Sequence, residues 1–502
     1  MSLKKNVIAN FVGQCWTAIM GIAFIPLYIK YLGIEAYGLI GFYVLMQAWL
    51  VLFDMGITQT LNREMARFSA GAHTSQSIND LLRSLEIVTF LLALCIFVIV
   101  WISSNYISTS WLSVKQLTLP EVSSAITLVG LVIALRLIEG IYKGCLLGLQ
   151  KQVAVNIVNI IIATLRFAGA VGVLAWYVAN IEIFFIWQAF TSVISIILFV
   201  YLTYQSLPKP KKLAKFSSNA IKQIWHFSGG MIWISFLALL LTNVDKVILS
   251  RLITLEDYGY YTLATVLAGG IALIGIPITQ AIYPRLVECV TQNKQDELTK
   301  LYHQGAQLIS CLVAPLAIML VFFGQDIIYL WSGNSILASN TAPILLPLVI
   351  GTFLNCLVWM PYQVQLAYGW TGFAIKVNTI AVLILVPAIL LIVPQYGAQG
   401  AAWVWAILNA GYITIAMHFM HKRLLKKEKW KWYLNDVAKQ IISAAIAMML
   451  IHSIPTDLIG GRLPQTIIYI LGLWLAICFT ILQSSYIKPL TLSILCKSFI
   501  KK

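Results

Sequence analysis

Apolar runs of about 20 residues recur along the whole chain, and each is long enough to cross about 30 Å of hydrocarbon as a helix. They lie near residues 6–29, 37–58, 84–103, 124–147, 153–176, 181–203, 226–249, 258–284, 305–324, 342–367, 374–394, 398–420, 437–454 and 465–485. Apolar and polar residues do not alternate in them, as they would in the strands of a membrane β-barrel. The sequence therefore predicts an all-α integral membrane protein with about fourteen transmembrane helices.

The distribution of charge predicts the orientation of the spans. Only 10% of the 502 residues are charged, against about 25% in soluble domains, and the net charge is +16. Most Lys and Arg residues fall in alternate segments between the spans, and the opposite segments hold only Lys30, Lys115, Arg251 and Arg462. Since cytoplasmic loops are enriched in Lys and Arg, both termini are expected in the cytoplasm, and the positive charge implies no nucleic-acid partner.

A short block near the N-terminus returns 221 residues later. Ile34–Gly38 (Ile-Glu-Ala-Tyr-Gly) returns as Leu255–Gly259 (Leu-Glu-Asp-Tyr-Gly), and Ile57–Gln59 returns as Ile278–Gln280 at the same offset. Each copy contains six predicted spans, so both enter the membrane the same way up. A parallel repeat of this kind is typical of secondary transporters. The sequence predicts two six-helix bundles followed by two extra helices.

The expected boundaries follow from this repeat. We expect an N-terminal bundle at 1–205, a cytoplasmic linker at 206–225, a C-terminal bundle at 226–422, and a basic loop with two extra helices at 423–502. The linker mixes lysines and prolines with apolar residues, which fits either an amphipathic helix on the inner leaflet or a solvated basic connection.

Two arginines are predicted to lie deep within consecutive spans. Arg136 falls near the middle of the fourth span and Arg166 well inside the fifth. Ionisable groups at such depth usually face a cavity or a partner, and a guanidinium matches the oxygens of a diphosphate. The alternative is that Arg136 pairs with Glu139, three residues away on the same helix face, as a structural lock.

Other residues are candidates for ion coupling or gating. Asp54 could bind an ion or proton, or pair with Arg63. Gly56 and Pro277 occupy equivalent repeat positions, and both residue types weaken a helix, which suggests a matched pair of bending sites near the substrate or ordinary packing of a kinked helix.

Another pair of candidates lies in the seventh span. Asp245 and Lys246 are adjacent on its helix, so we expect them to point in different directions and one of them to line the cleft between the halves.

Several motifs that would indicate other chemistry are missing from the sequence. It contains no Gly-x-x-x-x-Gly-Lys-[Ser/Thr] phosphate loop, no Asp-x-Asp pair, no CxxC and no HExxH. We therefore expect neither an enzyme nor a metal site nor another cofactor. Transport would run on a proton or sodium gradient, or on the gradient of the substrate itself.

The chain resembles the polysaccharide-export and O-antigen flippase family of the multidrug/oligosaccharidyl-lipid/polysaccharide exporter superfamily. The resemblance rests on the stretches Tyr31–Gly38, Phe53–Gly56, Leu61–Ala66, Gly144–Asn156, Asn243–Lys246 and Gly397–Ala402. It implies a MATE-like fold in which two bundles surround a cavity. It also implies a bacterial inner-membrane protein that moves an undecaprenyl-diphosphate-linked oligosaccharide, such as an O-antigen repeat unit, from the cytoplasmic to the periplasmic leaflet.

The resemblance also suggests roles for individual residues. Arg136 and Arg166 would bind the diphosphate, the amides of Gln14, Asn159 and Gln188 would bind the sugars, and Lys246 would also contact the substrate. Coupling or gating would fall to Asp54, Glu139, Asp245, Gly56 and Pro277. The implied partners are the lipid-linked glycan, the phospholipid bilayer, a polysaccharide polymerase and a chain-length regulator. The alternatives are a drug or metabolite antiporter of the same fold and a membrane-embedded glycan polymerase, although no long outer loop of the kind expected for a polymerase is seen in the sequence.

Overall fold

The structure is a computed structural model that describes residues 3–54, 56–69, 71–208, 212–217, 236, 239–454 and 461–488. Its chain forms two compact units, Met1–Gly259 (unit 1) and Tyr260–Lys502 (unit 2). Within the described residues the regular structure is helical, apart from one isolated parallel β-bridge between Ser113 and Thr254. The prediction of an all-α membrane protein is confirmed.

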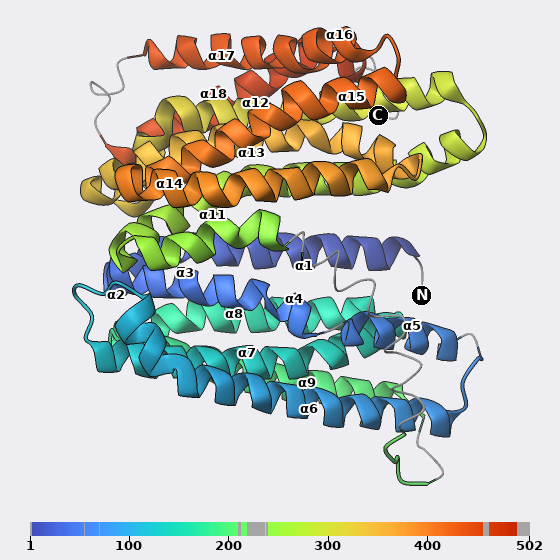
Figure 1. Cartoon of the computed structure of the whole chain (residues 1–502), viewed down its shortest axis with the longest axis vertical. Helices are drawn as coiled ribbons and strands as arrows, with labels where there is room; N and C mark the ends of the chain where they lie inside the picture. The colour runs from blue at the N-terminus through green and yellow to red at the C-terminus, as the bar shows by residue number, and fades with distance from the viewer. Residues whose placement is uncertain are drawn as a thin grey trace, which may run out of the picture. The chain divides into compact units, whose positions relative to one another are not determined.

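Unit 1 contains the first nine α-helices in chain order (Figure 1). They are α1 (Leu3–Ala23), α2 (Ile25–Leu32), α3 (Ile34–Ala48), α4 (Leu50–Phe53), α5 (Ile57–Ser69), α6 (Ser75–Tyr106) continued by the π-helical turn η1 (Ile107–Trp111), α7 (Leu119–Gly148), α8 (Gln152–Trp176) and α9 (Ile181–Ser206). Residues 239–252 are also helical. Helix α7 packs against α5, α6 and α9, while α8 packs against α1 and α9.

Helix α7 is central to unit 1 because its sequence allows a close neighbour. Gly140, Gly144 and Gly148 recur every fourth residue and form a stripe of minimal side chains on one face. A Cβ on Gly144 would meet the backbone of Thr58, and one on Gly148 would meet that of Asn62. Small residues at this spacing let helix backbones approach in a membrane, so α5 lies directly against α7.

The repeated block Ile34–Gly38 begins α3, and its acidic residue fixes a loop. The buried carboxylate of Glu35 accepts hydrogen bonds from the backbone N–H groups of Lys115, Gln116 and Leu117 at 2.5, 2.6 and 3.0 Å. Three charge-assisted bonds to one carboxylate satisfy backbone donors just before α7 begins. The Glu of the motif is therefore structural, and it ties the start of α3 to the loop between η1 and α7.

Unit 2 holds the remaining helices, although the first turn of α11 (Leu255–Thr291) belongs to unit 1. They are α12 (Gln295–Ser332), α13 (Ser335–Ala367), α14 (Thr371–Gly411), η2 (Tyr412–Ala416), α15 (Met417–Arg423), α16 (Lys429–Lys431), η3 (Trp432–Ala438), α17 (Lys439–His452) and α18 (Arg462–Gln483). Helices α12, α13 and α14 pack in sequence, and the two extra helices, α17 and α18, pack on each other and on α12 (Figure 1).

The number of spans agrees with the sequence prediction once one kink is resolved. Eleven helices of the described chain are long and apolar enough to cross a membrane, and one of them, Thr371–Arg423, has 53 residues. At about 1.5 Å per residue this helix would be far longer than the bilayer is thick. Gly397, at φ 55° and ψ −146°, divides it into two limbs that match the predicted spans 374–394 and 398–420. The short apolar helix α3 and the helical residues 239–252 overlap the other two expected spans, 37–58 and 226–249, and are shorter than a full span.

The linker between the predicted halves is described only in part. Residues 209–211 and 218–235 lie outside the described residues, so an amphipathic helix there stays a prediction. Residues 212–217 are not helical. The backbone N–H groups of Lys212, Lys215 and Ser217 donate to the side chains of Gln76, Asp80 and Ser84, respectively, which share one face of α6. The predicted boundary of 206–225 is likewise still a prediction.

Candidate functional site

The intramembrane charges of α7 and α8 form one buried group in unit 1. We call Tyr43, Arg136, Glu139, Lys143 and Arg166 the arginine cluster. The buried carboxylate of Glu139 forms an ion pair with Lys143, and its Oε2 lies 3.8 Å from Nη2 of Arg166. The two predicted guanidiniums therefore do belong to a single polar site on neighbouring helices.

Arg136 does not form the ion pair with Glu139 that a structural lock would require. Its guanidinium carbon lies 5.7 Å from the ring centroid of Tyr43, a cation–π geometry. The carboxylate of Glu139, three residues along α7, is instead engaged by Lys143 and Arg166. Arg136 is thus held over an aromatic face and is not the main counter-ion of Glu139.

The arginine cluster has more hydrogen-bond donors than acceptors. Nε of Arg136 and both Nε and Nη2 of Arg166 are buried without a hydrogen-bond partner, as are one carboxylate oxygen, Oε2 of Glu139, and the hydroxyl of Tyr43. The 3.8 Å contact between Arg166 and Glu139 is an ion pair but is too long for a hydrogen bond. Each unsatisfied buried donor costs about 1–3 kcal/mol, and more when it is charged. Three cations and one carboxylate leave the site with excess positive charge, so it is suited to bind an anion.

Two of the proposed gating residues lie where α4 gives way to α5. Gly56 has a φ of 73°, which favours glycine, and it separates the two helices. Asp54 accepts hydrogen bonds from Oγ1 and the backbone N–H of Thr58, at 2.7 and 3.3 Å. The carboxylate thus caps α5. Pro277, the repeat equivalent of Gly56, lies inside the continuous helix α11, so the two positions differ in local structure.

Asp245 and Lys246 lie on the helical residues 239–252. Nζ of Lys246 is 3.6 Å from a carboxylate oxygen of Asp245 and donates to the carbonyl of Thr242 at 2.9 Å. The expectation that adjacent side chains must point apart was wrong, because the long lysine side chain reaches back along its own helix. The ammonium group of Lys246 is engaged by neighbours within that helix.

No contact found among the described residues joins the three amides proposed for sugar binding. Gln14 is exposed on α1, Asn159 is half-buried on α8, and Gln188 is buried on α9. A different set of amides, which was not predicted from the sequence, forms hydrogen bonds between α1 and α8. Nδ2 of Asn156 donates to Oδ1 of Asn10 at 2.6 Å, and Nδ2 of Asn10 donates to Gln152 at 2.9 Å.

The spacing of these amides could have revealed them. Gln152 and Asn156 are one helical turn apart at the start of α8, and they pair with Asn10 of α1. They therefore form a polar seam between two apolar helices, which positions α8 and the arginine that it carries.

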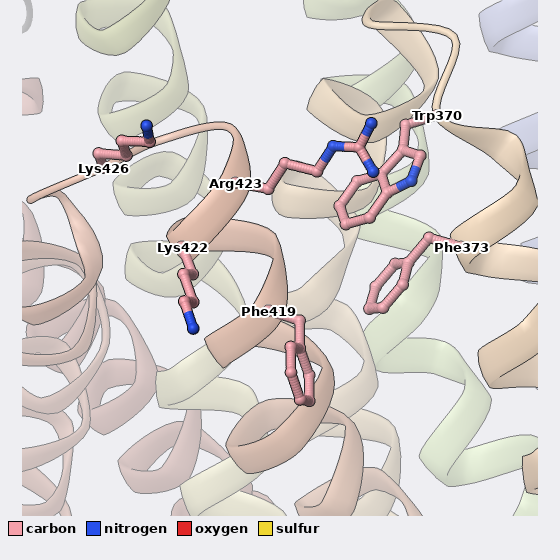
Figure 2. Close-up of a pocket in the computed structure, with 6 residues that line it drawn as sticks. All are labelled: Trp370, Phe373, Phe419, Lys422, Arg423 and Lys426. Carbon is pink, nitrogen blue, oxygen red and sulfur yellow. The ribbon is translucent and has the colours of Figure 1, made fainter.

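A pocket of about 550 Å³ in unit 2 combines aromatic and basic side chains (Figure 2). We call it the basic–aromatic pocket, and it is lined by Trp370, Phe373, Phe419, Lys422, Arg423 and Lys426. The guanidinium carbon of Arg423 lies 4.4 Å from the ring centroid of Trp370. The ring of Trp370 in turn stacks on that of Phe373, with centroids 4.4 Å apart and planes 16° apart.

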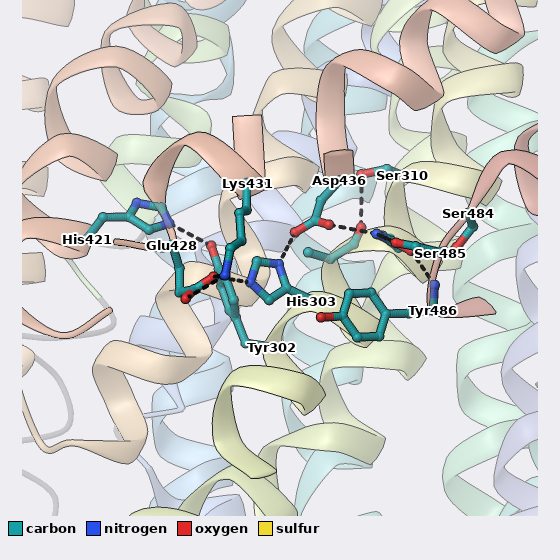
Figure 3. Close-up of polar contacts among 12 residues, drawn as sticks. Tyr302, His303, Ser310, His421, Glu428, Lys431, Asp436, Ser484, Ser485 and Tyr486 are labelled. Carbon is teal, nitrogen blue, oxygen red and sulfur yellow. Dashed lines mark hydrogen bonds and ion pairs between the residues drawn. The ribbon is translucent and has the colours of Figure 1, made fainter. Parts of the chain in front are cut away.

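A second buried polar cluster in unit 2 surrounds a histidine (Figure 3). Nδ1 of His303 bonds Asp436, and its Nε2 lies 3.0 Å from a carboxylate oxygen of Glu428. Gln307 donates to Asp436 at 2.8 Å and accepts from Oγ of Ser484 at 2.5 Å. An imidazole can donate from both nitrogens only as imidazolium, so the cluster favours a charged His303.

This histidine cluster joins three parts of unit 2. It links α12 to η3 and to the residues that follow α18, and so fastens the extra helices to the bundle. This role of His303 in joining the helices was not predicted from the sequence, in which the histidines were considered only as metal ligands. Glu428 lies outside the spans; partial burial raises its pKa, but hydrogen bonds from Lys431 and His303 outweigh this effect and hold the pKa below its ordinary value.

Comparisons with known proteins match most of the chain. Residues 3–290 match the family model described as polysaccharide biosynthesis protein. A Shigella flexneri protein named "Putative O-antigen transporter" is 21% identical over 411 residues, which cover 81% of this chain and 95% of that protein.

Two solved structures are similar over nearly their whole length. The lipid II flippase MurJ in an inward closed conformation has a TM-score of 0.65 at 15% identity and covers 94% of this chain and 97% of its own. An inward-facing multidrug resistance MATE family transporter of the MOP superfamily has a TM-score of 0.64 at 12% identity, over 82% and 94% of the two chains. At these identities the structural matches establish the fold, which is that of the MurJ and MATE transporters.

Proposed function

The chain belongs to the polysaccharide biosynthesis protein family, and from this premise we propose that it flips an undecaprenyl-diphosphate-linked oligosaccharide from the cytoplasmic to the periplasmic leaflet. The observation that carries the proposal is the arginine cluster, where two buried guanidiniums keep unused donors. A membrane transporter of this fold needs no covalent chemistry, so a flippase is favoured over an enzyme.

The charge of the arginine cluster selects the class of substrate. A diphosphate offers several oxygen acceptors and negative charge, which complement the unused donors of Arg136 and Arg166. The same charge opposes a cationic drug, because two like charges at short range in a low dielectric repel strongly. The likeness to a multidrug MATE transporter keeps a drug or metabolite antiporter as the second candidate.

Energy coupling and location complete the proposal. In the absence of a phosphate loop, flipping would be driven by a proton or sodium gradient or run down the gradient of the glycan lipid itself. The alternation of basic segments supports a bacterial inner-membrane location with both termini in the cytoplasm. A polymerase and a chain-length regulator would act on the flipped product.

The test replaces each arginine in a strain whose own copy has been deleted. Arg136→Ala or Arg166→Ala should lower surface polysaccharide at least about tenfold, since loss of a hydrogen bond to a charged group is worth about 1.5–3 kcal/mol. Arg83→Ala is the matched control, because this arginine is exposed and pairs with Glu86 outside the cluster. Immunoblots of membranes check that each variant is present.

Three outcomes separate the candidates. Normal glycan with both arginine variants would remove the cluster as a diphosphate site. If the wild type exports a cationic dye and the Arg136→Ala variant exports it faster, the antiporter would be favoured. Flipping in vesicles that persists unchanged when ionophores collapse both gradients would exclude ion coupling.

A further inference from the structure

The basic–aromatic pocket adjoins a long apolar groove in unit 2. The groove lies between the two limbs of the helix Thr371–Arg423 that meet at Gly397, and it has a volume of about 550 Å³. It shares Phe373 and Phe419 with the pocket, so the two lie side by side. Apart from Lys376 and Tyr412, the side chains that line the groove are apolar.

The length of the groove can be measured along the chain. Its second wall runs from Val404 to Phe419, which corresponds to about 22 Å at 1.5 Å per residue. One leaflet provides about half of the roughly 30 Å hydrocarbon core. A single acyl chain that starts at the pocket can therefore lie in the groove over its whole length.

The pocket at the end of this groove carries positive charge without compensation. None of the ion pairs found among the described residues involves Lys422, Arg423 or Lys426, and its six lining residues include no carboxylate. Arg423 is pre-positioned on the face of Trp370, which leaves the edge of its guanidinium for an anion (Figure 2). Alternation of charge along the sequence assigns this end to the cytoplasmic leaflet.

We propose that this site binds an acidic glycerophospholipid of the cytoplasmic leaflet. Its phosphate would contact Arg423, with Lys422 and Lys426 adding positive charge around it, and one acyl chain would occupy the groove. Basic pockets between transmembrane helices on the cytoplasmic side bind anionic headgroups in this way. A soluble phosphate compound would leave the adjoining groove unfilled, which favours a lipid.

The lining also favours a phospholipid over the glycan lipid of the proposed function. None of the six pocket residues is an amide or a hydroxyl residue, so the pocket lacks the uncharged polar side chains that both donate to and accept from sugar hydroxyls. The proposal is independent of transport, since it concerns a lipid bound beside the helices of unit 2 and not the transported substrate.

The experiment measures lipid retention by native mass spectrometry on protein taken from nanodiscs of phosphatidylcholine with or without phosphatidylglycerol. Wild-type protein should retain phosphatidylglycerol in preference to phosphatidylcholine. Arg423→Gln should weaken phosphatidylglycerol binding about fivefold, since one cation near the surface is worth about 1 kcal/mol. The triple variant with Lys422→Gln, Arg423→Gln and Lys426→Gln should abolish the preference.

A matched triple variant separates the pocket from general surface charge. Lys300→Gln, Lys427→Gln and Lys439→Gln remove the same charge from exposed positions that do not line the pocket, and this variant should bind like the wild type. Equal losses in the two triple variants would overturn the proposal.

The groove is tested separately. Gly411 lines it and has open space where a Cβ would stand, so Gly411→Leu should fill the groove without a clash and reduce retention of phosphatidylglycerol. Unchanged retention would argue against an acyl chain there. Displacement of phosphatidylglycerol by glycerol 3-phosphate would indicate a simple anion site. Stronger displacement by a polyprenyl phosphate would indicate the carrier lipid instead, and either result overturns the assignment to a phospholipid.

Discussion

Gly38 and Gly259, the final residues of the two copies of the repeated block, pack backbone to backbone where α3 and α11 begin. A Cβ on Gly38 would meet the carbonyl oxygen of Leu255, and a Cβ on Gly259 would meet that of Ile34. The two copies of the repeated block therefore pack against each other in equivalent ways, because the Cβ position of each glycine lies against the backbone of the other copy. Glycine is required here for close approach, because both residues lie in helices.

Gly38→Ala or Gly259→Ala should destabilise the protein by about 1–3 kcal/mol, because the neighbouring atoms are backbone and cannot move aside cheaply. The measurement is thermal unfolding in detergent. Gly372→Ala, at an exposed position with open space around it, is the control and should be neutral. Equal behaviour of all three variants would refute the close packing.

Glu35→Gln should loosen the loop before α7. It replaces a carboxylate that accepts three backbone hydrogen bonds with an amide that has one acceptor oxygen. Hydrogen bonds to charged groups contribute about 1.5–3 kcal/mol, so a loss of that order is expected. Faster hydrogen exchange at residues 115–117 would be the direct sign, with the exposed Asp296→Asn as control. Unaltered protection of those amides would contradict the assignment.

Glu139→Gln should destabilise unit 1 by about 3–5 kcal/mol, because it leaves the largely buried Arg166 and the half-buried Lys143 without their carboxylate. Lys143→Met in the same chain should recover part of this loss, and the double variant should be more stable than the sum of the two singles predicts. A double-mutant cycle in detergent measures the coupling. Strict additivity would mean that the ion pair contributes nothing.

The depressed pKa of Glu428 makes the attachment of the extra helices sensitive to acid. A carboxyl whose pKa is lower in the folded state contributes stability that is complete above its unfolded pKa, about 4.3, and is lost as the pH falls through the folded value. The melting temperature of wild-type protein should therefore fall in this acid range more than that of Glu428→Gln. Parallel curves for the two proteins would show that this carboxyl does not contribute.

The sequence predicted the architecture well because its signals are local and strong. Apolar runs determine spans, and constant-offset Glu, Tyr and Gly residues revealed the repeat. The sequence also placed Arg136 and Arg166 in one region, because ionisable groups deep within consecutive spans are expected to face the protein interior and not the lipid. It could not show which carboxylate each cation would meet, since Arg136 and Lys143 both lie within about one helical turn of Glu139.

Contacts that depend on rotamers or on distant residues were beyond the sequence analysis. Asp245 and Lys246 meet because a flexible lysine folds back, which helix spacing alone does not predict. His303 meets Asp436 across 133 positions, and no periodic pattern connects the two. The structural use of Glu35 was equally hidden, because its partners are backbone groups, which carry no residue signature.

The contact of residues 212–217 with α6 has a consequence for biosynthesis. The backbone N–H groups of that segment donate hydrogen bonds to Gln76, Asp80 and Ser84. These three acceptors emerge from the ribosome more than a hundred residues before the segment does. The acceptors are thus already in place when the segment appears, and domains made first generally fold first. The segment can therefore pair with α6 as soon as it is synthesised, before any of the later helices exist.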